Sequence, residues 1–384
     1  MIGGCRLRPW AVERRPGRLN VDATQPAGSP RSRRRDRADT VRPRRWRGGK
    51  GQRGSNAAGE GPVYGALDLG TNNCRLLVAR PRGQGFTVVD AFSRIVRLGE
   101  GIGLTGMLKP EAMDRTIEAL RVCANKLKWH GVSRQRLIAT EACRLAGNGE
   151  AFIARVAAET GLELEIIDRE TEARLAASGA EPLIERGAET AVVFDIGGGS
   201  TEIMWVKRTE GQHFAIGHWT SLPAGVVTVS EKFGGGRDVT SDSFAAMRQH
   251  VRDLLAPFLA EVRQATGSDG VPSHLLGTSG TVTTIAGVYL GLRRYDRARV
   301  DGCWLNSADV GQVTDRLHAM SYEERSRNAC IGQERADLVL SGCAILEEIR
   351  QAFPAPRIRV ADRGLREGIL TQLMRADGYL GDRP

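Results

Sequence analysis

A twelve-residue pattern occurs twice in this chain, 127 positions apart, as residues 66–77 and 193–204. The two copies align without a gap. Each is an apolar run ending in Asp, then one aliphatic residue, a turn of Gly and small polar residues, and a second apolar run. Such a pattern predicts a strand, a tight turn and a returning strand. The repeat therefore predicts two related halves, with Asp68 and Asp195 held beside equivalent turns.

The residue types in these turns favour contact with an anion. Gly, Ser and Thr leave backbone N–H groups free to approach phosphate oxygens closely. The second copy has three consecutive glycines, Gly197 to Gly199, whose conformational entropy cost a simple turn does not require. The alternative is a structural turn in which the Asp caps its own backbone. The doubling favours a cleft for phosphate and metal between the two halves.

The net charge of +10 is concentrated at the start of the chain. Residues 1–60 hold 16 Lys and Arg against 5 Asp and Glu, whereas the remainder holds 39 against 40. We expect residues 1–61 to form a disordered, Arg-rich extension that is dispensable for chemistry. A basic arm that binds nucleic acid or an acidic polymer is the alternative.

Cysteine and histidine usage argues against a disulfide framework and a zinc site. The seven cysteines are scattered with no CxxC spacing, and the six histidines are isolated. Reduced thiols predict a cytoplasmic location. The sequence contains no apolar run of about 18 residues, so it predicts no membrane-spanning helix.

The body, at a length that suggests about two domains, alternates strand and helix patterns in both halves, which predicts an α/β fold. Residues 162–167 alternate at period two and predict a half-buried strand. Asp168 is then expected to cap a helix over residues 169–178, in which Glu170 would pair with Arg174 one turn later.

Several short motifs occur in order along this body, at residues 68–72, 97–101, 139–144, 172–175, 195–202, 277–281 and 364–368. With these motifs the chain resembles the exopolyphosphatase and guanosine pentaphosphate phosphatase (Ppx/GppA) family, within the superfamily of actin, hexokinase and sugar kinases. The resemblance runs from about residue 63 to residue 374. It implies two actin-like (ribonuclease H-like) domains around a cleft, and the short form of the family that lacks a further helical region.

The resemblance implies the following domain boundaries. Domain I is expected over residues 62–182 and domain II over residues 188–368. Residues 369–384 are expected to form a C-terminal helix that returns toward domain I.

The resemblance also implies roles for particular residues. Glu172 matches the family's catalytic glutamate, which activates the attacking water, and Arg144 matches an arginine that binds the phosphate chain, with Arg94 and Arg97 as weaker candidates. Mg²⁺ is expected on the carboxylates Asp68, Asp195 and Glu202, because it prefers a few carboxylates together with water and substrate oxygens. Phosphate is expected on Thr71, Asn72, Gly198, Gly199, Ser200, Gly280 and Thr281.

Two positions depart from the family's pattern: Glu141 stands where Ser or Thr is common, and Cys143 where Leu or Val is common. A carboxylate facing a polyanion would be unfavourable. We therefore expect Glu141 to face away from the cleft, toward an arginine.

The predicted function is hydrolysis of the terminal phosphate of inorganic polyphosphate with Mg²⁺. Hydrolysis of guanosine pentaphosphate is the nearest alternative. A kinase or ATPase with an adenosine pocket near residues 276–281, and a binding protein that senses polyphosphate or guanosine alarmones without turnover, are two others. The sequence leaves a homodimer open.

Overall fold

The fold is taken from a computed structural model that describes residues 61–210, 213–267 and 271–381. The Arg-rich extension predicted over residues 1–61 lies outside this part of the chain except for Gly61. Within these ranges, no helix combines the length and apolar character needed to cross a membrane.

The first sheet has five strands in the order β3-β2-β1-β4-β5. Their bounds are Tyr64–Leu69 (β1), Asn73–Arg82 (β2), Gly85–Ile95 (β3), Arg134–Ala139 (β4) and Glu165–Ile166 (β5). Strands β1, β2 and β3 pair antiparallel, whereas β4 and β5 continue the sheet in parallel. The strand predicted over residues 162–167 is thus reduced to two residues. Leu162 and Leu164 are instead buried in the core under this sheet, so their alternation reflects packing rather than pairing.

The second sheet has six strands in the order β10-β11-β9-β6-β7-β8. Their bounds are Thr190–Ile196 (β6), Thr201–Arg208 (β7), Phe214–Leu222 (β8), Leu275–Thr278 (β9), Trp304–Asn306 (β10) and Arg357–Val360 (β11). The hairpin β6–β7 occupies the position that β1–β2 has in the first sheet, and each first strand has a parallel neighbour on its other side. The repeated sequence pattern is therefore a repeated topology, and the α/β prediction is confirmed.

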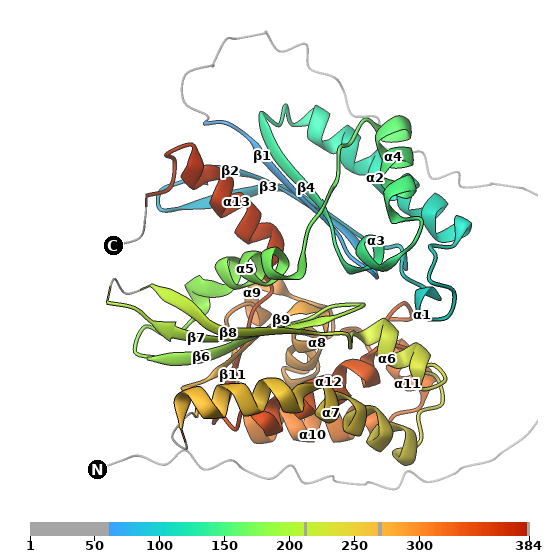
Figure 1. Ribbon diagram of the computed structural model, residues 1–384, viewed down its shortest axis with the longest axis vertical. Coiled ribbons are helices and arrows are strands. Elements are labelled where there is room, and N and C mark those ends of the chain that lie inside the picture. The colour runs from blue at the N-terminus through green and yellow to red at the C-terminus, as the bar shows by residue number, and fades with distance from the viewer. Residues whose placement is uncertain (1–60, 211–212, 268–270, 382–384) are drawn as a thin grey trace, which may run out of the picture. The chain divides into compact units, whose positions relative to one another are not determined.

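Helices cover both faces of the first sheet (Figure 1). One face packs on α2 and α4, and the other on α5 and α13. The helices of this half are Ile102–Thr105 (α1), Pro110–Trp129 (α2), Glu141–Leu145 (α3), Gly149–Thr160 (α4) and Arg169–Ala180 (α5), which a 3-10 turn, Glu181–Leu183, extends. Helix α13 comes from the end of the chain and spans Leu365–Ala376, so it begins four residues before the predicted boundary at 369.

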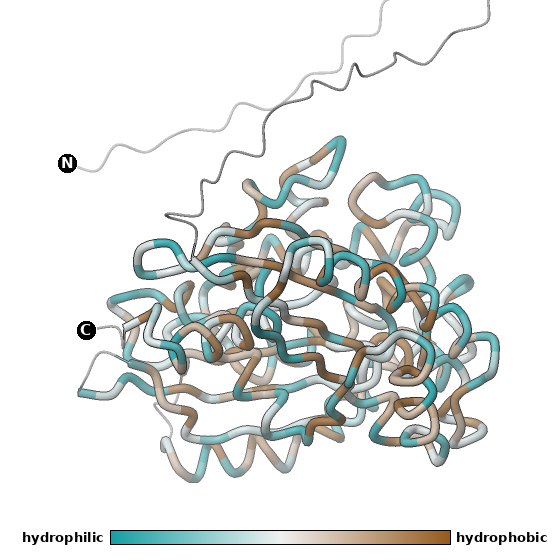
Figure 2. The backbone as a smooth tube through the Cα atoms, turned by 90° about the horizontal axis from the view of Figure 1, so that it is seen from above, coloured by the Kyte–Doolittle hydropathy of each residue, from teal (hydrophilic) through white to brown (hydrophobic). Residues whose placement is uncertain are grey.

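The largest core lies under the second sheet, between its strands and α7, α8, α10 and α12. The helices of this half are Val226–Lys232 (α6), Ser241–Thr266 (α7), Ser279–Tyr289 (α8), Arg297–Val300 (α9), Ser307–Ala319 (α10), Tyr322–Arg327 (α11) and Val339–Ala352 (α12). Figure 2 shows the apolar segments running through the body, with polar segments frequent in the outer loops.

Helix α5 lies between the two sheets (Figure 1). Its Leu175 is buried in the core of the first sheet, while Ala173 and Ala180 are buried in a core with β6 and β7 of the second. It also crosses α13 closely, because a Cβ on Gly179 would lie 1.8 Å from the carbonyl oxygen of Gly364. The helix that carries Glu172 is therefore fixed by both halves of the body.

Candidate active site

The two repeated turns have the same backbone arrangement. Gly70 N donates to Asn73 O at 2.9 Å in the first, and Gly197 N donates to Ser200 O at 2.9 Å in the second. In the strand register Asp68 stands opposite Arg75, and Asp195 stands opposite Glu202. The equivalence read from the sequence is therefore retained atom for atom in the turns, while the residue facing each Asp differs in charge.

The two turns approach each other so closely that glycine is required in the second. A Cβ on Gly198 would lie 2.9 Å from Cβ of Thr71, and one on Gly199 would lie 2.7 Å from Oγ1 of Thr71. Contacts below 3.0 Å are essentially absent for real Cβ atoms. The glycines thus allow the two halves to meet, a reason that sequence alone did not supply.

A pocket of about 120 Å³ opens where the turns meet. It brings together all the predicted site residues except Arg144, namely Asp68, Thr71, Asn72, Glu172, Asp195, Gly198, Gly199, Ser200, Glu202, Gly280 and Thr281. A larger hollow of about 690 Å³ adjoins it and shares Asp68, Arg75 and Asp195 with it. The residues predicted from separate motifs therefore converge on one place.

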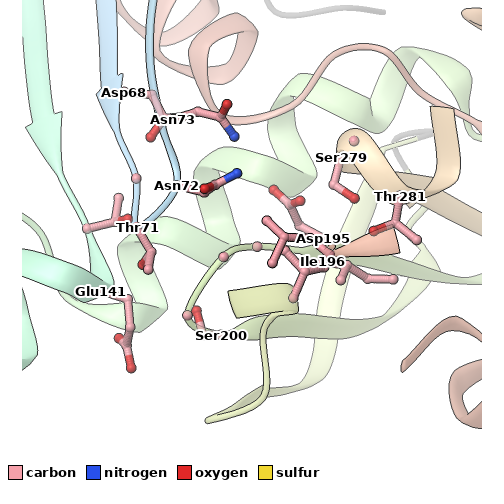
Figure 3. A pocket seen from close by; sticks show the side chains of 18 of the residues that line it. Asp68, Thr71, Asn72, Asn73, Glu141, Asp195, Ile196, Ser200, Ser279 and Thr281 are labelled. Carbon is pink, nitrogen blue, oxygen red and sulfur yellow. The ribbon is translucent and has the colours of Figure 1, made fainter. Parts of the chain in front are cut away.

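Polar groups around this pocket lack partners. Among the described residues, the backbone N–H groups of Thr71, Asn72, Gly198 and Gly199 donate no hydrogen bond. The buried Oδ1 of Asn72 and Oγ of Ser279 are also unpartnered. Figure 3 shows these side chains around one space, at the first turn of α8. Free N–H groups at tight turns and at a helix N-terminus are typical of a phosphate site.

Two predicted phosphate contacts are modified by the geometry. The hydroxyl of Ser200 donates to Glu202 Oε1 at 2.7 Å, so it serves the carboxylate in this structure. The side chain of Thr281 packs against α12, since a Cβ on Gly342 would lie 2.4 Å from its Oγ1. Both residues still line the pocket.

Burial raises the pKa of each carboxyl group predicted to hold metal. Burial raises the pKa of Asp68, and repulsion from Asp195 adds to this against the opposing attraction of Arg75. The pKa of Asp195 is likewise raised by burial. Burial, followed by repulsion from Asp195, raises the pKa of Glu202 to about 7. These groups retain protons at a pH where exposed carboxyls have lost them.

The three carboxylates line one pocket, but they do not form a complete set of metal ligands. In the ranges that the structure covers, no three His, Cys, Asp or Glu side chains gather closely enough to hold a metal ion. A cation here would need ligands beyond the protein. Mg²⁺ commonly binds through one or two carboxylates, with water and phosphate oxygens completing its shell.

Glu172 projects into the pocket from the first turn of α5. The helix start is fixed by Asp168, whose Oδ1 accepts from Thr171 N at 2.7 Å, which confirms the predicted cap. Burial, followed by repulsion from Glu202, raises the pKa of Glu172 well above its ordinary value, against the attraction of Arg144. Glu170 pairs with Arg174 on the exposed side of the helix, as predicted.

Arg144 does not line the pocket; it lies behind Glu172. Its Nη2 donates to Glu172 Oε2 at 3.0 Å, its Nη1 to Ile167 O at 2.5 Å, and its Nε to Glu141 Oε2 at 3.0 Å. The carboxylate of Glu141 points away from Asp68 and Asn72 in Figure 3 and pairs with Arg144 and Arg169, so the expectation that it faces an arginine is confirmed. Glu141 nevertheless lines the pocket, so the expectation that it faces away from the cleft is wrong.

Of the weaker candidates, Arg97 pairs with Asp337 at 2.9 Å, and Arg94 lines the adjoining hollow. The sequence interpretation missed Arg75, Ser279 and Arg335, all of which line both hollows. Arg75 carried a signal, because it occupies in the first repeat the position of Glu202 in the second. Ser279 has φ 91°, a strained backbone value for a residue with a side chain. No local sequence pattern predicts this conformation.

Comparison with known proteins agrees with this geometry. The family model described as "Ppx/GppA phosphatase family" matches residues 77–376. An exopolyphosphatase 2 of Mycobacterium tuberculosis is 32% identical over 322 residues, which cover 80% of this chain and 97% of that protein.

Solved structures show the same likeness. A crystal structure of an exopolyphosphatase from Cytophaga hutchinsonii matches with a TM-score of 0.74 at 25% identity, covering 83% of this chain and all of that one. A Ppx/GppA family member from Aquifex aeolicus matches with a TM-score of 0.67 at 27% identity, covering 82% of this chain and 98% of that one. Because the family model covers most of the chain and the relatives are matched over nearly their whole length, this chain belongs to the Ppx/GppA phosphatase family.

Proposed function

We propose that this protein is an exopolyphosphatase, which releases terminal orthophosphate from inorganic polyphosphate by attack of water. The observation that carries the proposal is the position of Glu172, a largely buried carboxylate in a pocket whose walls present unpartnered N–H groups. The names of the relatives from Mycobacterium tuberculosis and Cytophaga hutchinsonii support polyphosphate as the substrate.

The two turns would bind the terminal phosphates from opposite sides. Thr71 and Asn72 would donate from the first turn, and Gly198 and Gly199 from the second, through N–H groups that have no described partner. Gly280 and Thr281 would contribute the N-terminus of α8. The side chain of Arg75 makes no hydrogen bond or ion pair with any described residue, so its guanidinium is available to a phosphate.

The donor set fits Mg²⁺. Asp68, Asp195 and Glu202 offer oxygen ligands. Burial raises the pKa of each, with repulsion from Asp195 adding to it at Asp68 and Glu202, and a divalent cation would compensate the ionised carboxylates. Because they do not close a site by themselves, phosphate oxygens and water would complete the shell. When bound, the ion would neutralise charge on the phosphoryl group that is transferred.

Glu172 would accept a proton from the attacking water. Its Oε2 is held by Arg144, and its Oε1 accepts no hydrogen bond from a described residue, which leaves that oxygen for water. A carboxyl with a raised pKa is a better proton acceptor once ionised. Arg144 would thus orient the base rather than bind the phosphate chain directly, a change from the role that the resemblance implied.

Hydrolysis of guanosine pentaphosphate is the second candidate. The adjoining hollow of about 690 Å³ favours it, because this hollow continues from the pocket and includes the aromatic ring of Tyr295. A nucleoside at the end of a phosphate chain could occupy such a space.

The test is release of orthophosphate by the purified chain in Mg²⁺, with kcat/KM measured side by side on polyphosphate and guanosine pentaphosphate. We expect the higher kcat/KM on polyphosphate, and a kcat lowered by about 10² to 10⁴ in Glu172→Gln. A preference for the nucleotide would favour the second candidate. Tight binding of polyphosphate without phosphate release would show a binding protein instead and would overturn both.

A cytoplasmic location is part of this proposal. The six cysteines in the described ranges are free of disulfides, and Cys74 and Cys123 remain unbonded although their Sγ atoms are 4.0 Å apart. Such a pair is expected to stay reduced in a reducing compartment.

A further inference from the structure

Charged side chains of helices α3 and α5 contact one another beside the pocket. Helix α3 contributes Glu141 and Arg144, and helix α5 contributes Arg169 and Glu172. Each pair is three residues apart, so both members lie on the same face of their helix. We call these four residues the charge quartet; its formal charges sum to zero.

The contacts within the charge quartet form one chain. Arg169 Nη2 donates to Glu141 Oε1 at 2.6 Å, Arg144 Nε donates to Glu141 Oε2 at 3.0 Å, and Arg144 Nη2 donates to Glu172 Oε2 at 3.0 Å. A further ion pair joins Arg144 Nη2 to Glu141. Glu141 therefore holds both arginines, and one of these arginines holds Glu172.

Glu141 lines the pocket, but its carboxylate is already engaged by arginines. Its side chain is 2% exposed, and both carboxylate oxygens accept from arginines. Its methylene groups pack against the second turn, since a Cβ on Gly199 would lie 3.0 Å from Cγ of Glu141. A buried carboxylate is tolerated only where hydrogen bonds and opposite charge compensate its lost solvation, and here two guanidinium groups do so.

We propose that Glu141 is a positioning residue for the hydrolysis, acting through Arg144 to fix the carboxylate of Glu172. The inference rests on the proposed function, because it takes Glu172 to be the base. With Nε held by Glu141 and Nη1 by Ile167 O, the guanidinium of Arg144 has one orientation, which directs Nη2 at Glu172 Oε2. Oε1 of Glu172 is thereby left without a hydrogen bond from the described residues.

Arg169 has a distinct part in this arrangement. Without it, Glu141 and Glu172 would share the single positive charge of Arg144, and Glu141 would weaken the hold of Arg144 on the base. Arg169 compensates Glu141 from the outer side, where its own side chain is 40% exposed. Glu141 is thus compensated by both arginines, whereas within the charge quartet Glu172 is held by Arg144 alone.

The charges that face Glu172 set the direction of each test. They are Glu202 on β7, Asp68 on β1, Arg144 on α3 and Arg169 on α5. Glu141 is linked to Glu172 through Arg144. Removing a negative member lowers the pKa of the base, and removing a positive member raises it. The acid limb of the pH profile of kcat/KM reports this pKa in the free enzyme.

Glu141→Gln is the first variant. We expect kcat to fall about tenfold to a hundredfold, the cost of a small misplacement of a catalytic group, while KM for polyphosphate changes less than about threefold. The acid limb moves to lower pH. The matched control is Glu170→Gln, the same change on α5 at a side chain that pairs with Arg174 outside the charge quartet, and it leaves kcat and the limb unchanged.

Arg169→Gln is the second variant and keeps the inference testable if Glu141→Gln does not fold, because Arg169 is the most exposed member of the charge quartet. Its acid limb moves the other way, to higher pH. The double variant Glu141→Gln with Arg169→Gln restores a neutral set and returns the limb to the wild-type position. A merely structural role would lower kcat in each variant without these opposite shifts.

The outcomes separate this inference from the proposed function. Full turnover by Glu172→Gln would overturn the proposed function, whatever Glu141 does. If Glu172→Gln is inactive while Glu141→Gln keeps wild-type kcat and an unmoved acid limb, the positioning role alone is wrong.

Discussion

The two repeated turns share a backbone and differ in charge. Both close through the same hydrogen bond, and both place an Asp at the end of a central strand. Across the hairpin, however, Asp68 faces an arginine, whereas Asp195 faces Glu202. One turn is thus balanced and has a guanidinium to offer an anion. The other concentrates negative charge and suits a cation. The comparison teaches that a single position, opposite the Asp, sets the charge of two otherwise similar hairpins.

The largest effect on kcat is expected at Glu172, beside the pocket where the two turns meet. Glu172→Gln removes the proton acceptor that serves a phosphate held by both, and we expect kcat to fall by about 10² to 10⁴. Steady-state phosphate release measures it. Binding of polyphosphate, followed by calorimetry, should persist, which would show that the two turns are still assembled; a loss of binding instead would mean that Glu172 holds the site together.

A matched pair of variants tests whether the two turns differ in the ligand that each one binds. Glu202→Gln should raise the half-saturating concentration of Mg²⁺ about tenfold or more, while Arg75→Gln should raise KM for polyphosphate by a similar factor, because a hydrogen bond to a charged group contributes roughly 1.5–3 kcal/mol. Each variant should leave the other constant nearly unchanged.

Arg82→Gln, on the exposed end of the same strand as Arg75, serves as the control. Equal effects of Glu202→Gln and Arg75→Gln on both constants would show that the turns are not specialised.

The buried carboxyl of Glu202 also makes the stability of the protein depend on pH. Glu202 has a folded-state pKa of about 7, above its ordinary value of 4.5, so it costs stability as pH rises between these values and costs nothing below 4.5. Glu202→Gln keeps the oxygen that accepts from Ser200 and Ser221, and should raise the free energy of unfolding at pH 8 by about 1–3 kcal/mol without Mg²⁺.

Urea unfolding at several pH values measures this gain. It should shrink toward zero as pH falls to 4.5. A gain that does not depend on pH would contradict the assignment of the cost to the ionised carboxylate.

The smallest effect tests the backbones of the turns. A Cβ on Gly197 would lie 2.9 Å from Ser200 O, whereas one on the equivalent Gly70 would have Asn73 O at 3.6 Å. Gly197→Ala should therefore destabilise the protein by about 1–2 kcal/mol, as overpacking commonly does, and Gly70→Ala by less than about 0.5 kcal/mol. Thermal unfolding compares them, and equal losses would mean that the turns are alike in their tolerance.

Local sequence patterns predicted the two hairpins, the Asp168 cap and the pairing of Glu170 with Arg174, because each feature depends on residues a few positions apart. Of the half-buried strand predicted over residues 162–167, only Glu165–Ile166 forms, since burial of Leu162 and Leu164 produces the same alternation as pairing does. The engagement of Arg144 with Glu172 and the contact of Gly198 with Thr71 depend on segments far apart in the chain. No spacing could have revealed them.

Helix α5 belongs to two cores at once, and this has a consequence for turnover. If the sheets rotate relative to each other, Leu175 must follow one and Ala173 the other, although they are two residues apart. The helix cannot satisfy both without tilting. Glu172 directly precedes Ala173 on this helix, so a tilt of α5 that accompanied opening of the body would also move the base, and reactivity would be limited to the closed arrangement.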